Sequence, residues 1–232
     1  MPMSLNPSPD KPGPRLYGRA SGHVLSARQA RLVETLLPQL GLPQNITSRA
    51  DLAPKGTPLW LEIGFGAAEH LLEQARLNPG VRLIGVEPYL NGIAKALGGI
   101  EDHGLNNIRL QRGDARLVVQ NLPDAVLDRV FILHPDPWPK TRHHKRRLIQ
   151  PAFVAQMART IRPGGRLRFA SDIAHYQAWA LARIMDCGQF EWTAERAGDW
   201  RRPPADHFTT RYEQKARKAG RSCVWLEFTR IH

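Results

Sequence analysis

An alternation of short apolar runs and amphipathic stretches, starting at Leu59, constrains the fold of this chain more than any other feature. The apolar runs that predict strands are residues 59–63, 81–86, 107–111, 128–133 and 166–170. The stretches that predict helices are residues 69–77, 89–104, 115–121, 148–161 and 175–187, the last but one ended by Pro163-Gly164-Gly165. Short strands separated by helices of this length predict an α/β fold, with a mostly parallel sheet and helices on both faces.

The two ends of the chain depart from this alternation. Residues 1–14 contain five prolines and almost no large apolar side chain, which predicts a disordered tail. A basic helical arm follows over about residues 15–43. It would cover the domain or contact RNA, and a merely solvated helix face is about equally compatible with its charges. Residues 222–230 alternate as a strand, with 191–193 as an antiparallel partner. We expect a single domain over residues 15–232.

The charge of the chain indicates an anionic partner. Lys and Arg number 33 against 21 Asp and Glu, a net charge of +12, so nucleic acid is the first candidate. Cys187 and Cys223 lack metal-site spacing, and no apolar run is long enough to cross a bilayer. We expect a cytoplasmic protein without a metal or a membrane partner.

An acid follows each of the five predicted parallel strands. These acids are Glu62, Glu87, Asp114, Asp136 and Asp172. Carboxylates are rarely buried without partners, and ligands of such sheets bind beyond the carboxyl ends of the strands. The five acids therefore predict a ligand site at that edge.

The turn after the first strand narrows the choice of ligand. Gly64 and Gly66 allow close backbone approach, but Glu69 stands where a dinucleotide-binding motif has its third glycine. A carboxylate there disfavours a pyrophosphate, which argues for S-adenosylmethionine. Glu62 and the glycine turn would hold its amino-acid end, Glu87 its ribose hydroxyls and Asp114 its adenine amine.

A proline-rich turn follows the fourth strand. Asp136 and Trp138 lie between prolines, directly before the cations of 140–147, and 211–221 carry a second cationic group. Both groups would contact RNA phosphates. Trp138 would stack on an extruded base or anchor the turn in the core, two roles that the sequence does not separate. The pair His143-His144 fits phosphate contact better than metal binding.

Three segments carry a family resemblance: Leu61-Glu-Ile-Gly-Phe-Gly66, Pro135-Asp-Pro-Trp138 with Lys140 and 142–147, and Thr210-Arg-Tyr-Glu213. From about Arg15 to the C-terminus, the chain resembles the bacterial tRNA (guanine-N7)-methyltransferase family. The resemblance implies a Rossmann-like, S-adenosylmethionine-dependent methyltransferase that acts on guanine 46 in the variable loop of tRNA. This family includes monomers, but the sequence does not determine the oligomeric state.

The resemblance also implies roles for individual residues. Asp136 would be the active-site residue. The cofactor site would comprise Glu62, Glu87, Asp114 and Asp136, together with Gly64 and Gly66 of the turn. The substrate would be contacted by Lys140, Asp172, Thr210, Arg211, Tyr212 and Glu213, with His143 and Arg146 on further polar positions of the catalytic face. The chain departs from the family pattern at Ala67-Ala68, Pro139 and Arg211-Tyr212.

The expected reaction needs no strong base, because guanine N7 carries a lone pair and no proton. Catalysis would depend on proximity, alignment and electrostatic field. Asp136 or Glu213 would either stabilise the cationic product or select guanine through hydrogen bonds, and both roles stay open. The alternatives are methylation of another RNA or of a small molecule, and RNA binding without catalysis.

Overall fold

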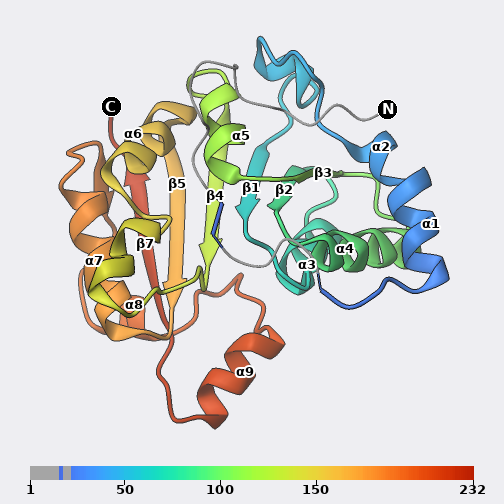
Figure 1. Ribbon diagram of the computed structural model, residues 1–232. Helices are drawn as coiled ribbons and strands as arrows, with labels where there is room; N and C mark the ends of the chain where they lie inside the picture. Colours follow the sequence, from blue (N-terminus) through green and yellow to red (C-terminus); the bar gives the residue numbers. More distant parts are fainter. Residues whose placement is uncertain (1–15, 18–21) are drawn as a thin grey trace. The chain divides into compact units, whose positions relative to one another are not determined.

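The computed structural model describes residues 16–17 and 22–232, so the tail predicted for residues 1–14 lies outside the described residues. The chain divides into two compact units (Figure 1). Unit 1 comprises the described residues of 1–58 and 64–123, and unit 2 comprises 59–63 and 124–232.

Unit 1 combines two parallel strands with helices. Its elements are α1 (Ala27–Thr35), α2 (Leu37–Leu40), the 3₁₀ helix η1 (Arg49–Asp51), α3 (Glu69–Leu77), β2 (Arg82–Glu87), α4 (Leu90–His103), β3 (Ile108–Arg112) and α5 (Ala115–Asn121). Strands β2 and β3 pair from Leu83 opposite Ile108 to Glu87 opposite Arg112. Apolar side chains of α3, β2 and α4 form the core, with Leu71, Ile84 and Leu97 fully buried.

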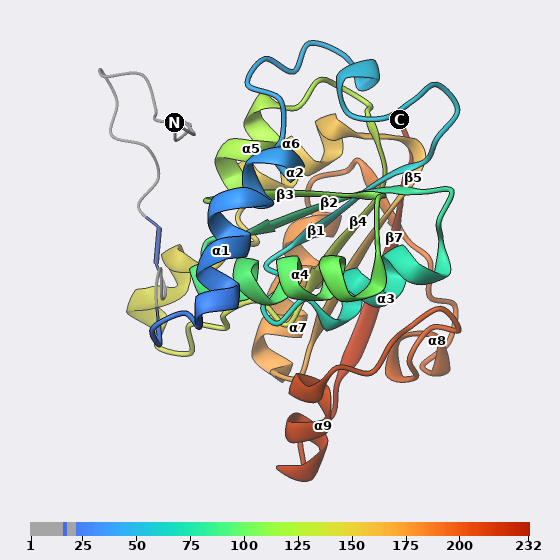
Figure 2. The ribbon, with the colours of Figure 1, turned by 90° about the vertical axis from the view of Figure 1, so that its right-hand side faces the viewer.

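The N-terminal arm of unit 1 packs on its own unit. Ser26 caps α1 through a capping box, and α1 packs across α4 (Figure 2). Arg28 pairs with Glu101 at 2.7 Å and also with Asp102, and Arg31 pairs with Glu101 at 2.9 Å. Of the roles compatible with the basic arm, the structure supports the covering role for these two arginines.

Unit 2 contains five strands in the order β1-β4-β5-β7-β6. Its elements are β1 (Leu59–Ile63), β4 (Leu127–Leu133), the 3₁₀ helix η2 (Thr141–Arg146), α6 (Pro151–Thr160), β5 (Ile161–Ser171), α7 (Ala174–Met185), β6 (Phe190–Trp192), α8 (Gly198–Arg201), α9 (Arg211–Lys218) and β7 (Val224–Arg230). Strands β1, β4 and β5 run parallel, whereas β7 runs antiparallel to β5 and β6. The predicted α/β class with mostly parallel strands and an antiparallel C-terminal strand is confirmed.

One predicted boundary is wrong. We expected Pro163-Gly164-Gly165 to separate a helix from the fifth strand, but β5 begins at Ile161 and continues through these residues. The register with β4 jumps from Leu127 opposite Ile161 to Arg129 opposite Arg166, so the extra residues form a bulge. A Cβ at Gly165 would lie 2.6 Å from Ile161 Cγ2, which explains why glycine is needed there.

Helix α9 was not predicted from the sequence. It begins where the Thr210 hydroxyl accepts a hydrogen bond from the Glu213 backbone N–H at 3.3 Å, and it lies beyond the ends of the unit 2 strands in both views (Figures 1 and 2). Only Glu213 and Ala216 of this helix are buried. Ala216 packs in a cluster with Ala170 and Trp225, which attaches α9 to the sheet.

Candidate active site

The glycine turn of unit 1 is held by a buried carboxylate. Gly64 and Gly66 adopt positive φ angles of 71° and 55°, which favour glycine. Glu87, only 6% exposed, accepts hydrogen bonds from Gly66 N at 2.8 Å and from Tyr89 N at 3.0 Å. Glu87 therefore fixes the shape of this turn, a role that the sequence did not indicate.

Of the three other strand-end acids predicted for the cofactor, Asp114 and Glu62 occupy different settings. Asp114 of unit 1 caps α5 by accepting from Arg116 N at 2.9 Å, and it also forms an ion pair with the Arg116 side chain. Glu62, at the end of β1 in unit 2, is 3% exposed. The structure thus places Asp114 at a helix start and buries Glu62 within its strand.

The turn after β4 presents Asp136 between two residues of unusual backbone geometry. His134 and Trp138 have φ angles of 51° and 42°, a region that bulky side chains rarely adopt. Asp136 is exposed, yet the protein around it displaces enough water to raise the pKa of its carboxyl above the usual range. The Arg146 guanidinium lies 5.0 Å from the Trp138 ring centre, and the His143 ring packs edge-on at 5.9 Å.

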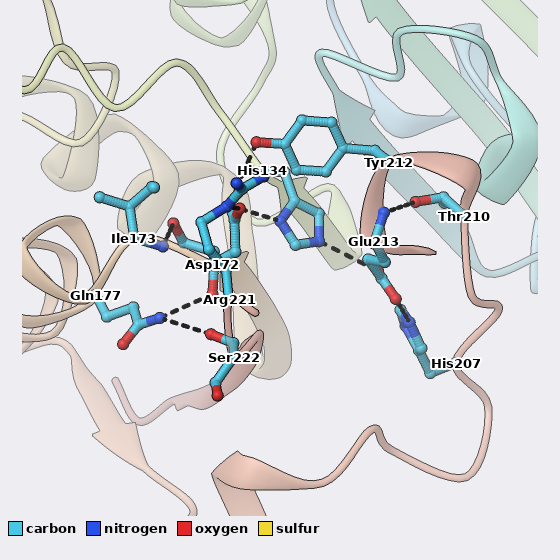
Figure 3. Close-up of polar contacts among 11 residues, drawn as sticks. His134, Asp172, Ile173, Gln177, His207, Thr210, Tyr212, Glu213, Arg221 and Ser222 are labelled. Carbon is cyan, nitrogen blue, oxygen red and sulfur yellow. Dashed lines mark hydrogen bonds and ion pairs between the residues drawn. The ribbon is translucent and has the colours of Figure 1, made fainter. Parts of the chain in front are cut away.

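Glu213 is the centre of a polar cluster in unit 2 (Figure 3). Its side chain is fully buried, and its two oxygens contact His134 Nε2 at 3.1 Å and His207 Nε2 at 2.8 Å. A carboxylate only accepts, so each imidazole presents an N–H to it. Burial alone would raise the pKa of Glu213, but the two histidine hydrogen bonds outweigh burial and lower the pKa to about 2.

The second acid of this cluster, Asp172, is held by three side chains from other parts of unit 2 (Figure 3). It accepts from Arg221 Nε at 2.6 Å and from the Tyr212 hydroxyl at 3.3 Å, and His134 Nδ1 lies 3.7 Å away. Burial opposes ionisation, yet the Arg221 hydrogen bond keeps the pKa of Asp172 below its usual range. Asp172 does not cap α7, because Ile173 occupies the cap position without a side-chain bond.

The segment that carries His207 is anchored to the sheet by ion pairs. Asp206 contacts Arg129 and Arg168 at 2.6 Å each, and Arg168 is 1% exposed. Burial would raise the pKa of Asp206, but the two guanidinium groups lower it to about 2. These contacts hold the backbone next to His207, and therefore the hydrogen bond from His207 to Glu213.

Two cations of the predicted RNA-contacting groups have partners within the protein, one of them buried and the other exposed. Arg147 is 2% exposed, and Arg221 is paired with Asp172, so the prediction that all of 140–147 face RNA is wrong for Arg147. His144 also turns inward, with its ring 4.8 Å from His175. The exposed cations of the two groups are Lys140, Arg142, Lys145, Arg211, Lys215, Arg217, Lys218 and Arg221, the last of them paired with Asp172.

The structure brings some predicted site residues together and leaves others separate. Thr210, Tyr212, Glu213 and Asp172 form one cluster in unit 2. Lys140, His143 and Arg146 lie on the turn after β4 and on η2, while Arg211 is exposed at the start of α9. No site role was assigned to His134 or His207. The Thr210-x-x-Glu213 spacing is a helix-start pattern that could have indicated α9, but nothing local indicated His207.

Two further kinds of feature are absent from the described ranges. Neither 16–17 nor 22–232 contains a group of three or more His, Cys, Asp or Glu side chains arranged to hold a metal. Across the same ranges, no helix combines the length and apolar character that crossing a membrane requires.

Comparison with solved structures shows the fold. The 16S rRNA methyltransferase KamB aligns with a TM-score of 0.60 and 16% identity, covering 82% of this chain and 96% of that one. The [4+2]-cyclase SpnF aligns with a TM-score of 0.53 and 14% identity, covering 87% and 80%. The chain therefore has the Rossmann-like fold of methyltransferases, a fold on which other chemistry also occurs.

Comparison at the level of sequence is more specific. Residues 56–226 match a family described as putative methyltransferase. A tRNA (guanine-N(7)-)-methyltransferase of Caulobacter vibrioides (strain NA1000 / CB15N) is 49% identical over 226 residues, which cover 96% of this chain and 99% of the relative. A protein of the same name from Hyphomonas neptunium is 48% identical, with 92% and 98% covered. With its full-length similarity to these enzymes and its Pro135-Asp-Pro-Trp138 turn, the chain belongs to the tRNA (guanine-N(7)-)-methyltransferase family.

Proposed function

We propose that this protein transfers a methyl group from S-adenosylmethionine to N7 of guanine 46 in the variable loop of tRNA. The observation that carries the proposal is the 49% identity to a tRNA (guanine-N(7)-)-methyltransferase over nearly the whole of both chains. The site geometry adds support residue by residue. We expect the reaction in the cytoplasm, with a monomer as the working unit.

The glycine turn of unit 1 fits the methyl donor. A Cβ built on Gly64 or Gly66 meets no described atom within 4 Å, so there is room beside this turn for a ligand to approach the backbone. Glu87 is a buried acceptor oriented by the turn itself, as binding of a ribose diol requires. We assign Glu62, Gly64, Gly66, Glu87 and Asp114 to donor binding.

The donor, when bound, would supply a sulfonium methyl group. N7 would attack the methyl carbon in one in-line step without proton transfer, and the C–S bond would break with its electron pair on sulfur, so that S-adenosylhomocysteine leaves. The purine gains positive charge in that step, so a nearby carboxylate stabilises the transition state. Asp136 is exposed and has a raised pKa, whereas the oxygens of Glu213 are buried against two histidines. We therefore assign charge stabilisation to Asp136 and a structural role in the substrate site to Glu213.

The exposed cations of the turn after β4 and of α9 suit a tRNA backbone. Lys140, Arg142 and Lys145 lie on or next to η2, and four cations of α9 are exposed. Phosphate contacts of this kind orient the nucleic acid and make its binding salt-dependent. Trp138 is half-buried beside Arg146, next to the carboxylate that we place at the reacting base.

One assay tests the proposal. The protein is incubated with labelled S-adenosylmethionine and unmodified tRNA, and the product is treated with borohydride and aniline, which cleave the strand at 7-methylguanosine. We expect label in tRNA and scission at position 46, and neither with a tRNA in which adenine replaces guanine 46. Label without scission would assign methylation to another atom, and absence of label would favour RNA binding without catalysis.

A further inference from the structure

We propose that Arg147 is a positioning residue that fixes the turn carrying Asp136 and Trp138, supported by His175, and is not a contact to RNA. This inference rests on the proposed function, because it assigns the means by which the reactive turn keeps its shape. It separates Arg147 from the exposed cations that precede it in the sequence.

Burial and contacts set Arg147 apart from its neighbours. The residue is 2% exposed, whereas Arg142 and Lys145 are exposed. In the described chain, its guanidinium has no carboxylate partner. It donates to the backbone carbonyl of Pro137 at 2.9 Å and to that of Trp138 at 3.4 Å. Burying a cation costs free energy unless its N–H groups find acceptors. These two carbonyls are principal acceptors for the N–H groups of Arg147.

Contacts with side chains of α7 fix the orientation of the Arg147 guanidinium group. The guanidinium lies 5.0 Å from the ring centre of Tyr176 and 4.8 Å from that of Trp179, both on α7. Its Nη2 lies 2.9 and 3.0 Å from the two ring nitrogens of His175, and a neutral imidazole offers one lone pair to such a donor. Partial desolvation of the ring and the nearby Arg147 charge lower the pKa of His175, which favours the neutral ring.

The turn needs such a clamp because its backbone is strained. Asp136 lies between His134 and Trp138, whose positive φ angles persist only where the surroundings enforce them. On the N-terminal side, His134 N donates to Ala170 O at 2.8 Å and its ring is held by Glu213. On the C-terminal side, Arg147 holds the carbonyls of Pro137 and Trp138. Without the hydrogen bonds from Arg147, the C-terminal half of the turn is no longer held, and Asp136 loses its fixed position.

The central experiment replaces Arg147 by Met and by Lys and measures kcat, the KM for tRNA and tRNA binding. We expect Arg147→Met to lower kcat roughly 10- to 100-fold, the cost of a displaced catalytic group, with tRNA affinity within about twofold of wild type. Arg147→Lys keeps the charge but loses the planar guanidinium group that donates to two carbonyls, so we expect an intermediate kcat. Millimolar guanidine should restore part of the activity of Arg147→Ala, as a bound guanidinium would reform the carbonyl contacts.

Two controls separate positioning from other roles. Arg183→Met removes a guanidinium that stacks on the same Trp179 at 4.5 Å, and we expect wild-type kcat. Lys145→Met removes an exposed cation, and we expect weaker tRNA binding with a smaller salt dependence. If Arg147→Met behaves like Lys145→Met, with kcat intact, Arg147 contacts phosphate and the proposal is overturned.

A third measurement does not depend on methyl transfer. Loosening of the turn should speed tryptic cleavage after Lys140 and Arg142 in Arg147→Met relative to wild type and Arg183→Met. If wild-type protein fails to methylate tRNA but this cleavage still accelerates, the proposed function fails and the clamp stands. Unchanged cleavage would overturn the clamp. If the Arg147 variants do not fold, His175→Ala tests the same contact: faster cleavage and lower kcat support it, and wild-type behaviour overturns it.

Discussion

The acids of unit 1 and unit 2 are held by contacts of different range. In unit 1, Asp114 bonds a group two residues away, and Glu87 bonds Tyr89 at the same spacing and Gly66 across 21 positions. In unit 2, Glu213 reaches His134 across 79 positions, and Asp172 reaches Arg221 across 49. The contacts of Asp114 and Glu87 thus span at most 21 positions, whereas Glu213 and Asp172 also depend on contacts that span 40 positions or more. The difference predicts that removing a buried acid of the cluster around Glu213 costs more folding free energy than removing an acid of unit 1.

The largest effect is expected from Glu213→Ala. Removal of this buried carboxylate leaves the N–H groups of His134 and His207 without their shared acceptor. Each hydrogen bond to a charged group is worth about 1.5–3 kcal/mol, so the loss for both should reach about 3 kcal/mol or more. Urea unfolding should show this loss in the free energy of unfolding, and Glu213→Gln, which keeps the shape and one acceptor, should lose less. A loss below about 1 kcal/mol for the alanine variant would remove Glu213 from the structural role assigned to it.

Asp136→Asn should have the next largest effect, on rate and not on stability. In the described chain Asp136 has neither an ion-pair nor a hydrogen-bond partner, so the neutral isostere should leave unfolding within about 0.5 kcal/mol of wild type. Loss of the charge that stabilises the cationic purine should lower kcat roughly 10²- to 10³-fold. Asp186→Asn, at an exposed acid after α7, is the matched control for loss of one negative charge. A kcat close to wild type in Asp136→Asn would remove this residue from the catalytic role.

The same contrast in contact range explains which features of the fold and the site could be predicted from the sequence. The strands, most helices and the glycine turn follow from period, glycine and proline, all of which act over a few residues. The bulge at Gly164-Gly165 could not be predicted in this way. Proline and glycine are typical both of a helix end and of a bulge, and only the pairing of β5 with β4 distinguishes the two.

The cationic run shows the limit most clearly. Lys145, Arg146 and Arg147 are consecutive and chemically alike, yet only Arg147 turns into the space beside Tyr176 and Trp179. That choice depends on α7, some thirty positions later in the sequence. His207 likewise has no local signal, because its role depends on Asp206 binding arginines of β4 and β5.

The pH dependence of stability offers a direct measure of the Glu213 cluster. The pKa of Glu213 is about 2 in the folded protein, below its ordinary 4.5, so its stabilising contribution is complete above pH 4.5 and is lost as the pH falls toward 2. That shift corresponds to about 3 kcal/mol. Urea titrations of wild type and Glu213→Gln from pH 6 downward should converge as the pH falls. A constant difference down to pH 3 would contradict the assignment.

In unit 1, a smaller effect is expected from Glu87→Gln. The amide keeps one acceptor but turns an NH₂ toward either the Gly66 or the Tyr89 N–H, so one charge-assisted bond, worth about 1.5–3 kcal/mol, is lost. We expect S-adenosylmethionine binding to weaken roughly tenfold by calorimetry, with a smaller loss of stability than in Glu213→Ala. Glu73→Gln, which removes a carboxylate from α3 where it pairs with Arg76, should bind the donor normally. Unchanged donor affinity in Glu87→Gln would remove this residue from the donor site.

The smallest effects concern single cations, and they extend the comparison from acids to bases. Lys145 of η2 and Lys218 of α9 are exposed, whereas Arg28 of α1 is already paired with Glu101 and Asp102. Each phosphate contact releases about one counterion, so Lys145→Met and Lys218→Met should each reduce the slope of log affinity for tRNA against log salt by about 1. Arg28→Met should leave that slope unchanged, because its charge is neutralised within unit 1. A slope reduced by Arg28→Met and not by the two lysine variants would place the RNA on unit 1. It would contradict the assignment of tRNA binding to the exposed cations of unit 2.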